Sequence, residues 1–323
     1  MNAPPWSGRR IPTAATAATA AASLLAVVAC GSTSTAVSNH GSAPTTSSSG
    51  ADTPAGASPM PSGAASGSPG MGGGVDMTGG AHHPDPGKGL LGTEDGYTLL
   101  PTTKALTAGT QTVSFRINDA TGKPVTSYAV DQTKLLHFYL VRADLTGYVH
   151  DHPVLAKDGT WSIKVNVSKP GPYRMYADFV AKDSAGKDHP VVLSTPLTAP
   201  GAYVPAALGA SPAAQTVDGL TIAMTGRITA GAASKVSFQV SADGKPVTDV
   251  EQYLDSFAHL TALHAGDLAY QHVHPELTAR PGQKGGPVLP FAVELPEKGT
   301  WRLFLQVQRA GVLHLVPFTV TVS

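Results

Sequence analysis

Histidine is the residue type in this 323-residue chain whose placement could do chemistry, because six of the twelve histidines follow one repeated spacing. The pattern is a histidine, twelve other residues, and then His-x-His-Pro. It occurs twice, with an offset of 122 residues, in a first triad of His137, His150 and His152 and a second triad of His259, His272 and His274. Among the other fourteen positions from 137 to 153, only Ala143, Tyr148 and Pro153 recur. Within this one chain, the histidines have persisted while their surroundings diverged.

Imidazole groups at this spacing can converge on a transition-metal ion. Residues i and i+2 of an extended segment project from the same face about 6.5 to 7 Å apart, so both imidazoles of His-x-His can reach one ion. His137 lies in the preceding apolar run, and twelve residues are enough for a hairpin to return the His-x-His beside it. Three neutral imidazoles, with a water or a fourth protein ligand, suit zinc or copper(II). The spacing therefore predicts one copper or zinc site in each copy of the pattern.

Two further histidines are candidates for a fourth ligand. His189 and His314 occupy similar places, at the start of the last strand expected in each copy. Asp178 is another candidate in the first copy, but Gln306 stands at the equivalent position. A carboxylate ligand therefore cannot be common to both copies.

The alternative is that the histidines are structural. His-x-His-Pro would then be a strand end closed by proline, and His137 a core imidazole hydrogen-bonded to a backbone carbonyl. Under that alternative, the side chains of His137 and His152 should face different environments.

The triads lie inside a longer internal repeat. Residues 113–117 and 122–126, which read VSFRI and GKPVT, correspond to 236–240 and 244–248, which read VSFQV and GKPVT. We therefore expect a first repeat at 93–200 and a second repeat at 217–323, joined by an Ala- and Pro-rich linker at 201–216.

Each repeat contains short alternating runs bounded by Gly, Pro or Asp, which is typical of β-strands. About seven strands in about 110 residues indicate an antiparallel sandwich. The sequence thus predicts an all-β fold with two tandem immunoglobulin-like β-sandwiches. The runs expected to be strands are 111–118, 135–142, 161–167, 172–181, 219–225, 235–241, 257–263, 288–295, 300–308 and 313–322. The large side chains expected in the two cores are Phe115, Phe138, Trp161, Phe238 and Trp301.

Residues 1–30 have the layout of a secretory signal peptide, with Arg9 and Arg10 before an Ala-rich apolar run that ends at Cys30. The sequence Val-Val-Ala-Cys at 27–30 resembles the bacterial lipobox, in which the cysteine is acylated. This resemblance accounts for the only cysteine and predicts an extracytoplasmic protein anchored to the cell membrane through lipidated Cys30. The alternatives are an ordinary cleaved signal or an uncleaved anchor helix, and the arginine pair leaves export by the Sec or the Tat route open.

Residues 31–92 are rich in Ser, Thr, Gly, Ala and Pro and are predicted to be a disordered tether, because they offer too little apolar surface to offset the entropy of ordering. Possible auxiliary metal ligands lie near the end of this tether, at Met71, Met77, His82 and His83. Thioether and imidazole groups suit copper, although a linker also tolerates these residues without function.

Charge and motif content exclude several other functions. The chain has 22 Lys and Arg against 22 Asp and Glu and no basic stripe, so we expect no nucleic-acid partner. It lacks a nucleophile elbow, a phosphate loop and a helical His-Glu-x-x-His pattern, so we expect a binding protein and not an enzyme.

The export signal and tether resemble those of actinobacterial extracytoplasmic lipoproteins. Over residues 93–323, the Tyr-x-His-x-His-Pro segments resemble those of secreted proteins encoded with heavy-metal handling systems, and the domains are similar to immunoglobulin-like sandwiches of the YtkA and CopC type. The resemblance implies that the two triads bind copper or another transition metal. The chain departs from CopC-like proteins because it is duplicated and has no histidine at the start of the mature domain.

Two functions are thus expected as alternatives. The first is a surface-tethered metal-binding protein that sequesters or relays copper or zinc. The second is a tandem immunoglobulin-like adhesion or scaffold lipoprotein whose histidines are structural and bind no metal.

Overall fold

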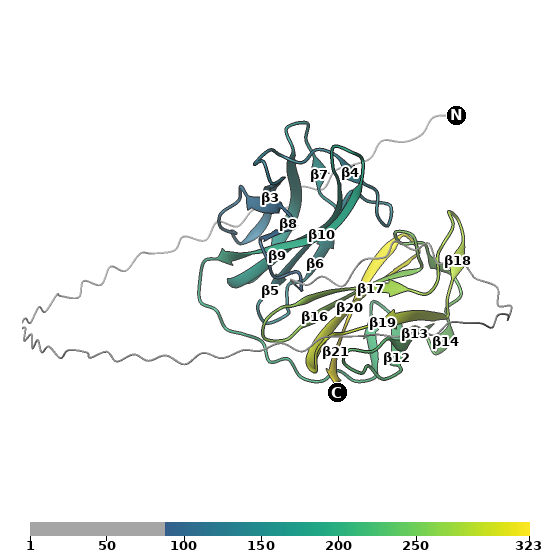
Figure 1. The fold of residues 1–323 in the computed structure, drawn as a ribbon. Helices are drawn as coiled ribbons and strands as arrows, with labels where there is room; N and C mark the ends of the chain where they lie inside the picture. The colour runs from purple at the N-terminus through teal and green to yellow at the C-terminus, as the bar shows by residue number, and fades with distance from the viewer. Residues whose placement is uncertain (1–87) are drawn as a thin grey trace, which may run out of the picture. The chain divides into compact units, whose positions relative to one another are not determined.

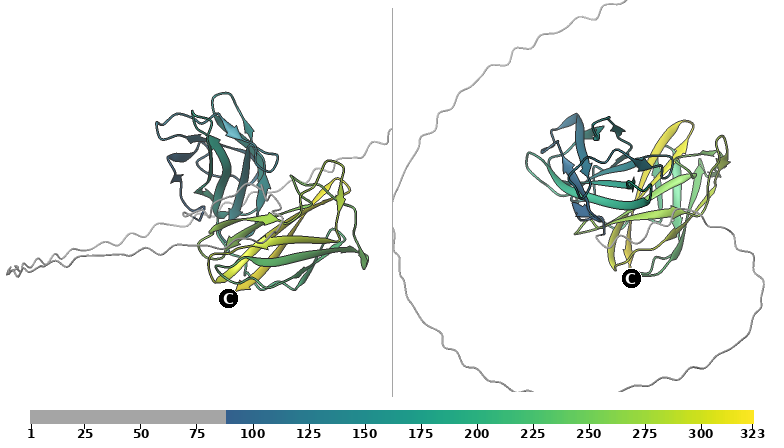
Figure 2. Two further views of the ribbon diagram at one scale, coloured as in Figure 1. Left: turned by 45° about the vertical axis from the view of Figure 1, so that its right-hand side comes forward. Right: turned by 45° about the horizontal axis from the view of Figure 1, so that its top comes forward.

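The computed structural model describes residues 88–323. The predicted signal peptide and Cys30, as well as Met71, Met77, His82 and His83 of the tether, lie outside these described residues. All regular secondary structure from residue 88 onward is β-strand, which confirms the all-β prediction (Figures 1 and 2). None of the described residues forms a helix with the length and apolarity that crossing a bilayer requires.

The first repeat is an immunoglobulin-like sandwich of two antiparallel sheets. One sheet has the strand order β1-β2-β3-β8-β7, and the other has the order β10-β9-β5-β6, with β4 paired to β9. The first sheet consists of β1 (Thr93–Glu94), β2 (Tyr97–Pro101), β3 (Gly109–Asn118), β7 (Val154–Leu155) and β8 (Thr160–Val167). The second consists of β4 (Tyr128–Ala129), β5 (Leu136–Arg142), β6 (Val149–Asp151), β9 (Gly171–Lys182) and β10 (Asp188–Ala199).

The second repeat is also an antiparallel sandwich, but one strand joins its sheets. The strand order is β11-β12-β13-β19-β17-β16-β20-β15-β18, with β14 paired to β13 and β21 paired to β20. The first strands are β11 (Ala214–Val217), β12 (Leu220–Thr225), β13 (Ser234–Ala242), β14 (Lys245–Pro246), β15 (Val250–Glu251) and β16 (Ala258–His264). The others are β17 (Tyr270–Pro275), β18 (Lys284–Gly285), β19 (Val288–Val293), β20 (Gly299–Arg309) and β21 (Val312–Val322).

The alternating strands bury one face in the core of their own repeat. In β3, for example, Val113, Phe115 and Ile117 are buried, while the residues between them are more exposed. The aromatic residues predicted to fill the two cores, Phe115, Phe138, Trp161, Phe238 and Trp301, are all buried. These core predictions are confirmed.

Strands β5 and β16 differ from the others because both of their faces are covered. All seven residues of β5 are buried, and so are the first six of β16. The even-numbered apolar residues of each strand belong to the core of its own repeat. The odd-numbered face of β5 carries His137, and that of β16 carries His259.

A third apolar cluster, the interface cluster, covers these odd-numbered faces. It combines residues of both repeats, which belong to one compact unit of the chain. Its buried members are Tyr139, Val141, Leu145, Tyr176, Val192, Leu263, Leu268, Tyr270 and Phe304. The two repeats therefore pack sheet against sheet, and each brings a histidine-bearing strand to the interface.

Candidate metal centre

The β5–β6 hairpin positions the first triad. These strands pair in antiparallel register, with Tyr139 opposite His150 and Phe138 opposite Asp151. Continuing this register by one residue brings His152 opposite His137. The return of His-x-His beside the preceding strand is therefore a consequence of the hairpin that the twelve-residue spacing predicts.

The nitrogen atoms of the first triad converge. His137 Nδ1 lies 3.2 Å from His150 Nε2 and 3.2 Å from His152 Nε2. All three ligand atoms lie within 4.8 Å of one another. Nitrogen atoms bound tetrahedrally to one ion at about 2.0 Å are about 3.3 Å apart. The spacing of the first triad thus suits coordination of a single ion.

Hydrogen bonds at the outer nitrogens determine which atoms face inward. His137 Nε2 lies 3.3 Å from the backbone oxygen of Asp131, and His150 Nδ1 lies 2.5 Å from Gln306 Oε1. Because carbonyl oxygens only accept hydrogen bonds, each of these nitrogens carries the ring proton. His137 Nδ1 and His150 Nε2 therefore present lone pairs to each other and cannot form a hydrogen bond. A cation between them would satisfy both, and outer hydrogen bonds of this kind are typical of metal-bound histidine.

Burial keeps these imidazoles neutral. It lowers the pKa of His150 well below the usual value of 6.5 and also lowers that of His137, and neighbouring histidines add to both shifts. Burial, followed by the nearby His137, lowers the pKa of His152 to about 3. Neutral imidazole is the form that binds metal, so the lone pairs of the first triad are available at neutral pH.

The second triad is arranged differently. The ring centres of His259 and His272 are 5.5 Å apart, and those of His272 and His274 are 5.1 Å apart. Within the described part of the chain, however, the nitrogen atoms of this triad do not form a group within 4.8 Å. Strand β17 pairs with β16 up to Val273 but pairs with β19 through His274. His274 is consequently exposed at the other sheet.

The inner histidines of the second triad contact oxygen-bearing and amide side chains. His259 Nε2 lies 3.3 Å from both the Tyr139 hydroxyl and Thr261 Oγ1. His272 Nδ1 lies 3.0 Å from Asp178 Oδ2, and the Gln132 amide contacts its Nε2. Burial lowers the pKa of His259 well below its usual value. The equivalent spacing in sequence therefore does not give an equivalent site.

The two triads also lie against each other, which differs from the prediction of a separate site in each repeat. The His150 and His259 rings stack with centres 4.4 Å apart, and the His137 and His259 ring centres are 6.1 Å apart. The reason is that the outer faces of β5 and β16 both pack at the repeat interface. A search within one repeat could not reveal this arrangement.

The predicted fourth ligands His189 and His314 lie elsewhere. His189 Nε2 contacts Asp183 Oδ2 at 3.0 Å, and His314 Nδ1 contacts Asp218 Oδ2 at 3.0 Å. Neither belongs to the group of converging nitrogens among residues 88–323. Both lie in strands that pair along the outer hairpins β9–β10 and β20–β21, so the expectation that they complete the triads is corrected.

Sequence reasoning missed the buried residues that contact the histidines of the two triads. In the sequence, Gln306 is only the residue that replaces Asp178 in the second repeat, yet both are buried and each contacts a histidine. The strand register could have identified these two residues. Asp178 pairs with His137 across β5 and β9, and Gln306 pairs with His259 across β16 and β20. Each is the residue opposite the first histidine of a triad.

Among residues 88–323, one other group has the atoms of a metal site. Ligand atoms of His264, Asp267 and Glu297 lie within 4.8 Å of one another. The Lys88 ammonium forms an ion pair with Glu297, and His264 Nδ1 contacts Asp267 Oδ1 at 2.8 Å. The Lys88 ammonium already pairs with one of the two carboxylates and His264 with the other, so the chemistry of this group does not single out a metal.

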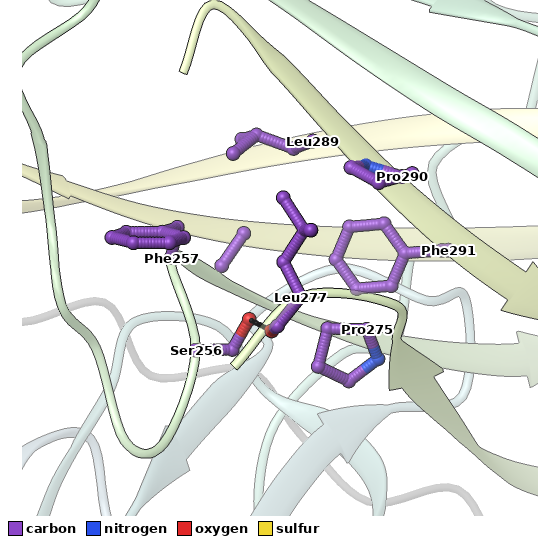
Figure 3. A pocket seen from close by; sticks show the side chains of 8 residues that line it. Ser256, Phe257, Pro275, Leu277, Leu289, Pro290 and Phe291 are labelled. Carbon is purple, nitrogen blue, oxygen red and sulfur yellow. Dashed lines mark hydrogen bonds between the residues drawn. The ribbon is translucent and has the colours of Figure 1, made fainter. Parts of the chain in front are cut away.

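An apolar pocket lies beside the end of β17 (Figure 3). It is a shallow hollow that is lined by Ser256, Phe257, Ala258, Pro275, Leu277, Leu289, Pro290 and Phe291. The Ser256 hydroxyl donates a hydrogen bond to the Leu277 backbone oxygen at 2.5 Å. The pocket therefore presents apolar surface around the proline of His-x-His-Pro and does not gather polar groups for a ligand.

Comparison with known proteins gives a family. A family model with the description "Domain of unknown function (DUF8832)" matches residues 92–193 and 215–323. No curated protein matches the sequence.

Among solved structures, a DUF4426 family protein from Pseudomonas aeruginosa PAO1 is 11% identical, with a TM-score of 0.25, over 34% of this chain and 94% of that one. InvD from Yersinia pseudotuberculosis is 12% identical, with a TM-score of 0.21, over 72% of this chain and 58% of that one. Invasin, a bacterial integrin-binding protein, is 13% identical, with a TM-score of 0.22, over 70% and 39%. The chain thus spans less than two thirds of InvD and invasin.

Proposed function

Since the chain belongs to the DUF8832 family, whose description names no activity, we propose a function from its own site. The protein binds a transition-metal ion outside the cytoplasm and sequesters or relays it. The first triad is the binding site. The observation that carries this proposal is the convergence of three imidazole nitrogens, two of them 3.2 Å from His137 Nδ1, with the ring protons of His137 and His150 directed outward.

Copper or zinc fits this donor set best. The first triad offers three nitrogen atoms and no sulfur, which suits Cu(II) or Zn(II). In the proposed relay, Met71, Met77, His82 and His83 of the tether provide softer auxiliary donors for Cu(I). The resemblance to YtkA- and CopC-like proteins supports copper.

The proposed location is the outer face of the cell membrane. Lipidation of Cys30 would attach the chain, and the tether from 31 to 92 would hold the two sandwiches away from the bilayer. A metal site on such a tether can capture ions before they reach the membrane.

The adhesion or scaffold alternative has less support. It requires His137 and His152 to face different environments, whereas their ring centres are 4.9 Å apart. The hydrogen bond from His137 to a backbone carbonyl, which the alternative also expects, orients the ring with its other nitrogen toward the triad. The proximity of the two rings favours metal binding, and the hydrogen bond is compatible with it.

Native mass spectrometry of the purified protein with Cu(II) or Zn(II) tests the proposal. We expect one tightly bound ion in the wild type and its loss in His150→Ala. His189→Ala is the matched control, because His189 contacts Asp183 and not the triad. Absence of a bound ion in the wild type, or equal binding in His150→Ala, would overturn the proposal.

A further inference from the structure

Each triad is oriented by a side chain from the opposite repeat. His150 of the first repeat contacts Gln306 of the second, and His272 of the second repeat contacts Asp178 of the first. Gln306 and Asp178 occupy equivalent positions, and both are buried. The contacts are therefore reciprocal across the interface.

The backbone explains this exchange. Asp178 lies on β9, opposite His137, and Gln306 lies on β20, opposite His259. Each supporting residue is thus anchored beside the first histidine of its own repeat but extends to the His-x-His of the other. A contact of this kind exists only when the two repeats are docked.

We propose that Gln306 is a positioning residue for the ion held by the first triad, so that metal binding in the first repeat depends on docking of the second. The inference rests on the proposed function. Gln306 Oε1 accepts the Nδ1 proton of His150, which leaves the Nε2 lone pair directed toward His137. Without this acceptor, His150 can rotate or carry its proton on the ligand nitrogen.

Docking itself depends on contacts that are separate from the first triad. The rings of Tyr148 and Phe304 stack with centres 3.9 Å apart, and the Tyr176 hydroxyl donates a hydrogen bond to the Leu268 backbone oxygen at 2.6 Å. Leu268 is a buried member of the interface cluster. Docking can therefore be perturbed without altering any residue of the first repeat.

The first test changes Gln306 and measures Cu(II) affinity by chelator competition. We expect Gln306→Leu to bind Cu(II) about ten- to a hundredfold more weakly, the usual effect of losing an outer-shell partner. Gln306→Glu restores an acceptor and should bind at least as tightly as the wild type. Gln308→Leu is the control, because Gln308 lies on the same strand and face but contacts Glu251.

A spectroscopic readout separates positioning from general destabilisation. The Cu(II) electron paramagnetic resonance spectrum of loaded Gln306→Leu should differ from that of the wild type, whereas Gln308→Leu should reproduce the wild-type spectrum. If Gln306→Leu keeps both the wild-type affinity and spectrum, the inference is overturned while the proposed function stands. If the wild type binds no metal, the proposed function itself fails.

The second test perturbs docking through Leu268→Asp in the second repeat. Burial of a charge in the interface cluster should separate the repeats while leaving every ligand of the first triad in place. We expect Cu(II) affinity to fall at least as far as in Gln306→Leu. Small-angle scattering and circular dichroism identify a separated but folded protein. Wild-type affinity in such a protein would overturn the dependence on docking.

Discussion

The two triads have the same spacing in sequence but different chemistry. In the first, three nitrogens converge, and the outer nitrogens of His137 and His150 face carbonyl oxygens. In the second, His259 faces two hydroxyls, and His272 contacts the Asp178 carboxylate. The spacing in sequence thus decides which histidines can lie close together. The side chains and backbone groups that contact each imidazole decide which of its nitrogen atoms is available to a metal ion.

The two triads also differ because the strands that carry their last histidines, β6 and β17, end at different points. Strand β6 ends at Asp151, and His152 remains partly buried beside His137. Strand β17 continues to Pro275 and pairs with β19, which carries His274 to an exposed position. A metal ion should therefore bind to the first triad in preference to the second.

Removal of the first histidine of each triad should give the largest difference in metal affinity between the two repeats. His137→Ala deletes the nitrogen to which the other two converge and should weaken Cu(II) or Zn(II) binding by more than about a hundredfold, beyond the usual effect of an outer-shell change. His259→Ala should change affinity by less than about tenfold, since His259 is not part of the converging group. Isothermal titration of the two variants measures this contrast. Equal losses would mean that the triads act as one site.

Acid should destabilise the metal-free protein. The pKa values of His137, His150 and His259 are lowered by burial, and that of His152 is lowered to about 3. The unfolded chain therefore binds more protons than the folded one as pH falls below about 6.5, so folding stability is lost through this range. Thermal unfolding between pH 7 and pH 4 should show a falling Tm.

Substitution of His150 tests whether the first triad causes this dependence of Tm on pH. His150→Gln should flatten the decline of Tm with acid, whereas the control Gln308→Leu, which removes no titratable group, should leave its slope unchanged. The comparison uses slopes, so a constant loss of stability in either variant does not affect it. An unchanged slope in His150→Gln would assign the dependence to other groups.

Local pattern was sufficient to predict much of the fold. The expected runs 111–118 and 219–225 agree closely with β3 and β12, because alternation along a strand reflects burial of one face. Strand β10 is the last strand expected to start near His189, although Pro190 and Pro196 interrupt its apolar residues and hide its alternating pattern. It lies at the edge of its sheet, where the missing N–H of proline is tolerated.

The proximity of the first triad could be predicted because a hairpin is a local structure. The role of Gln306 could not, because it depends on how two separately folded sandwiches pack. The pairing of His189 with Asp183 is also a local contact, since the turn between β9 and β10 brings that carboxylate back to the strand. Contacts within a hairpin follow from spacing, whereas contacts between repeats require the packed interface.

Tyr148 and Tyr270, which are equivalent in the two repeats, should differ by a smaller amount in their contribution to the free energy of unfolding. The Tyr270 hydroxyl donates a 2.8 Å hydrogen bond to the buried Asp178 carboxylate. Hydrogen bonds to charged groups contribute about 1.5–3 kcal/mol, so Tyr270→Phe should lower the free energy of unfolding by about that amount. Urea denaturation monitored by tryptophan fluorescence measures it. A loss below about 0.5 kcal/mol would show that other groups stabilise Asp178.

Tyr148→Phe should have the smallest effect. The Tyr148 hydroxyl donates a 3.0 Å hydrogen bond to Thr261 Oγ1, and both partners are neutral. The variant keeps the ring that stacks on Phe304, and Thr261 keeps its contact with His259. The expected loss in the same denaturation experiment is about 0.5–1.5 kcal/mol, typical of a neutral hydrogen bond. A loss as large as that of Tyr270→Phe would mean that the Asp178 charge does not distinguish the two halves of the interface.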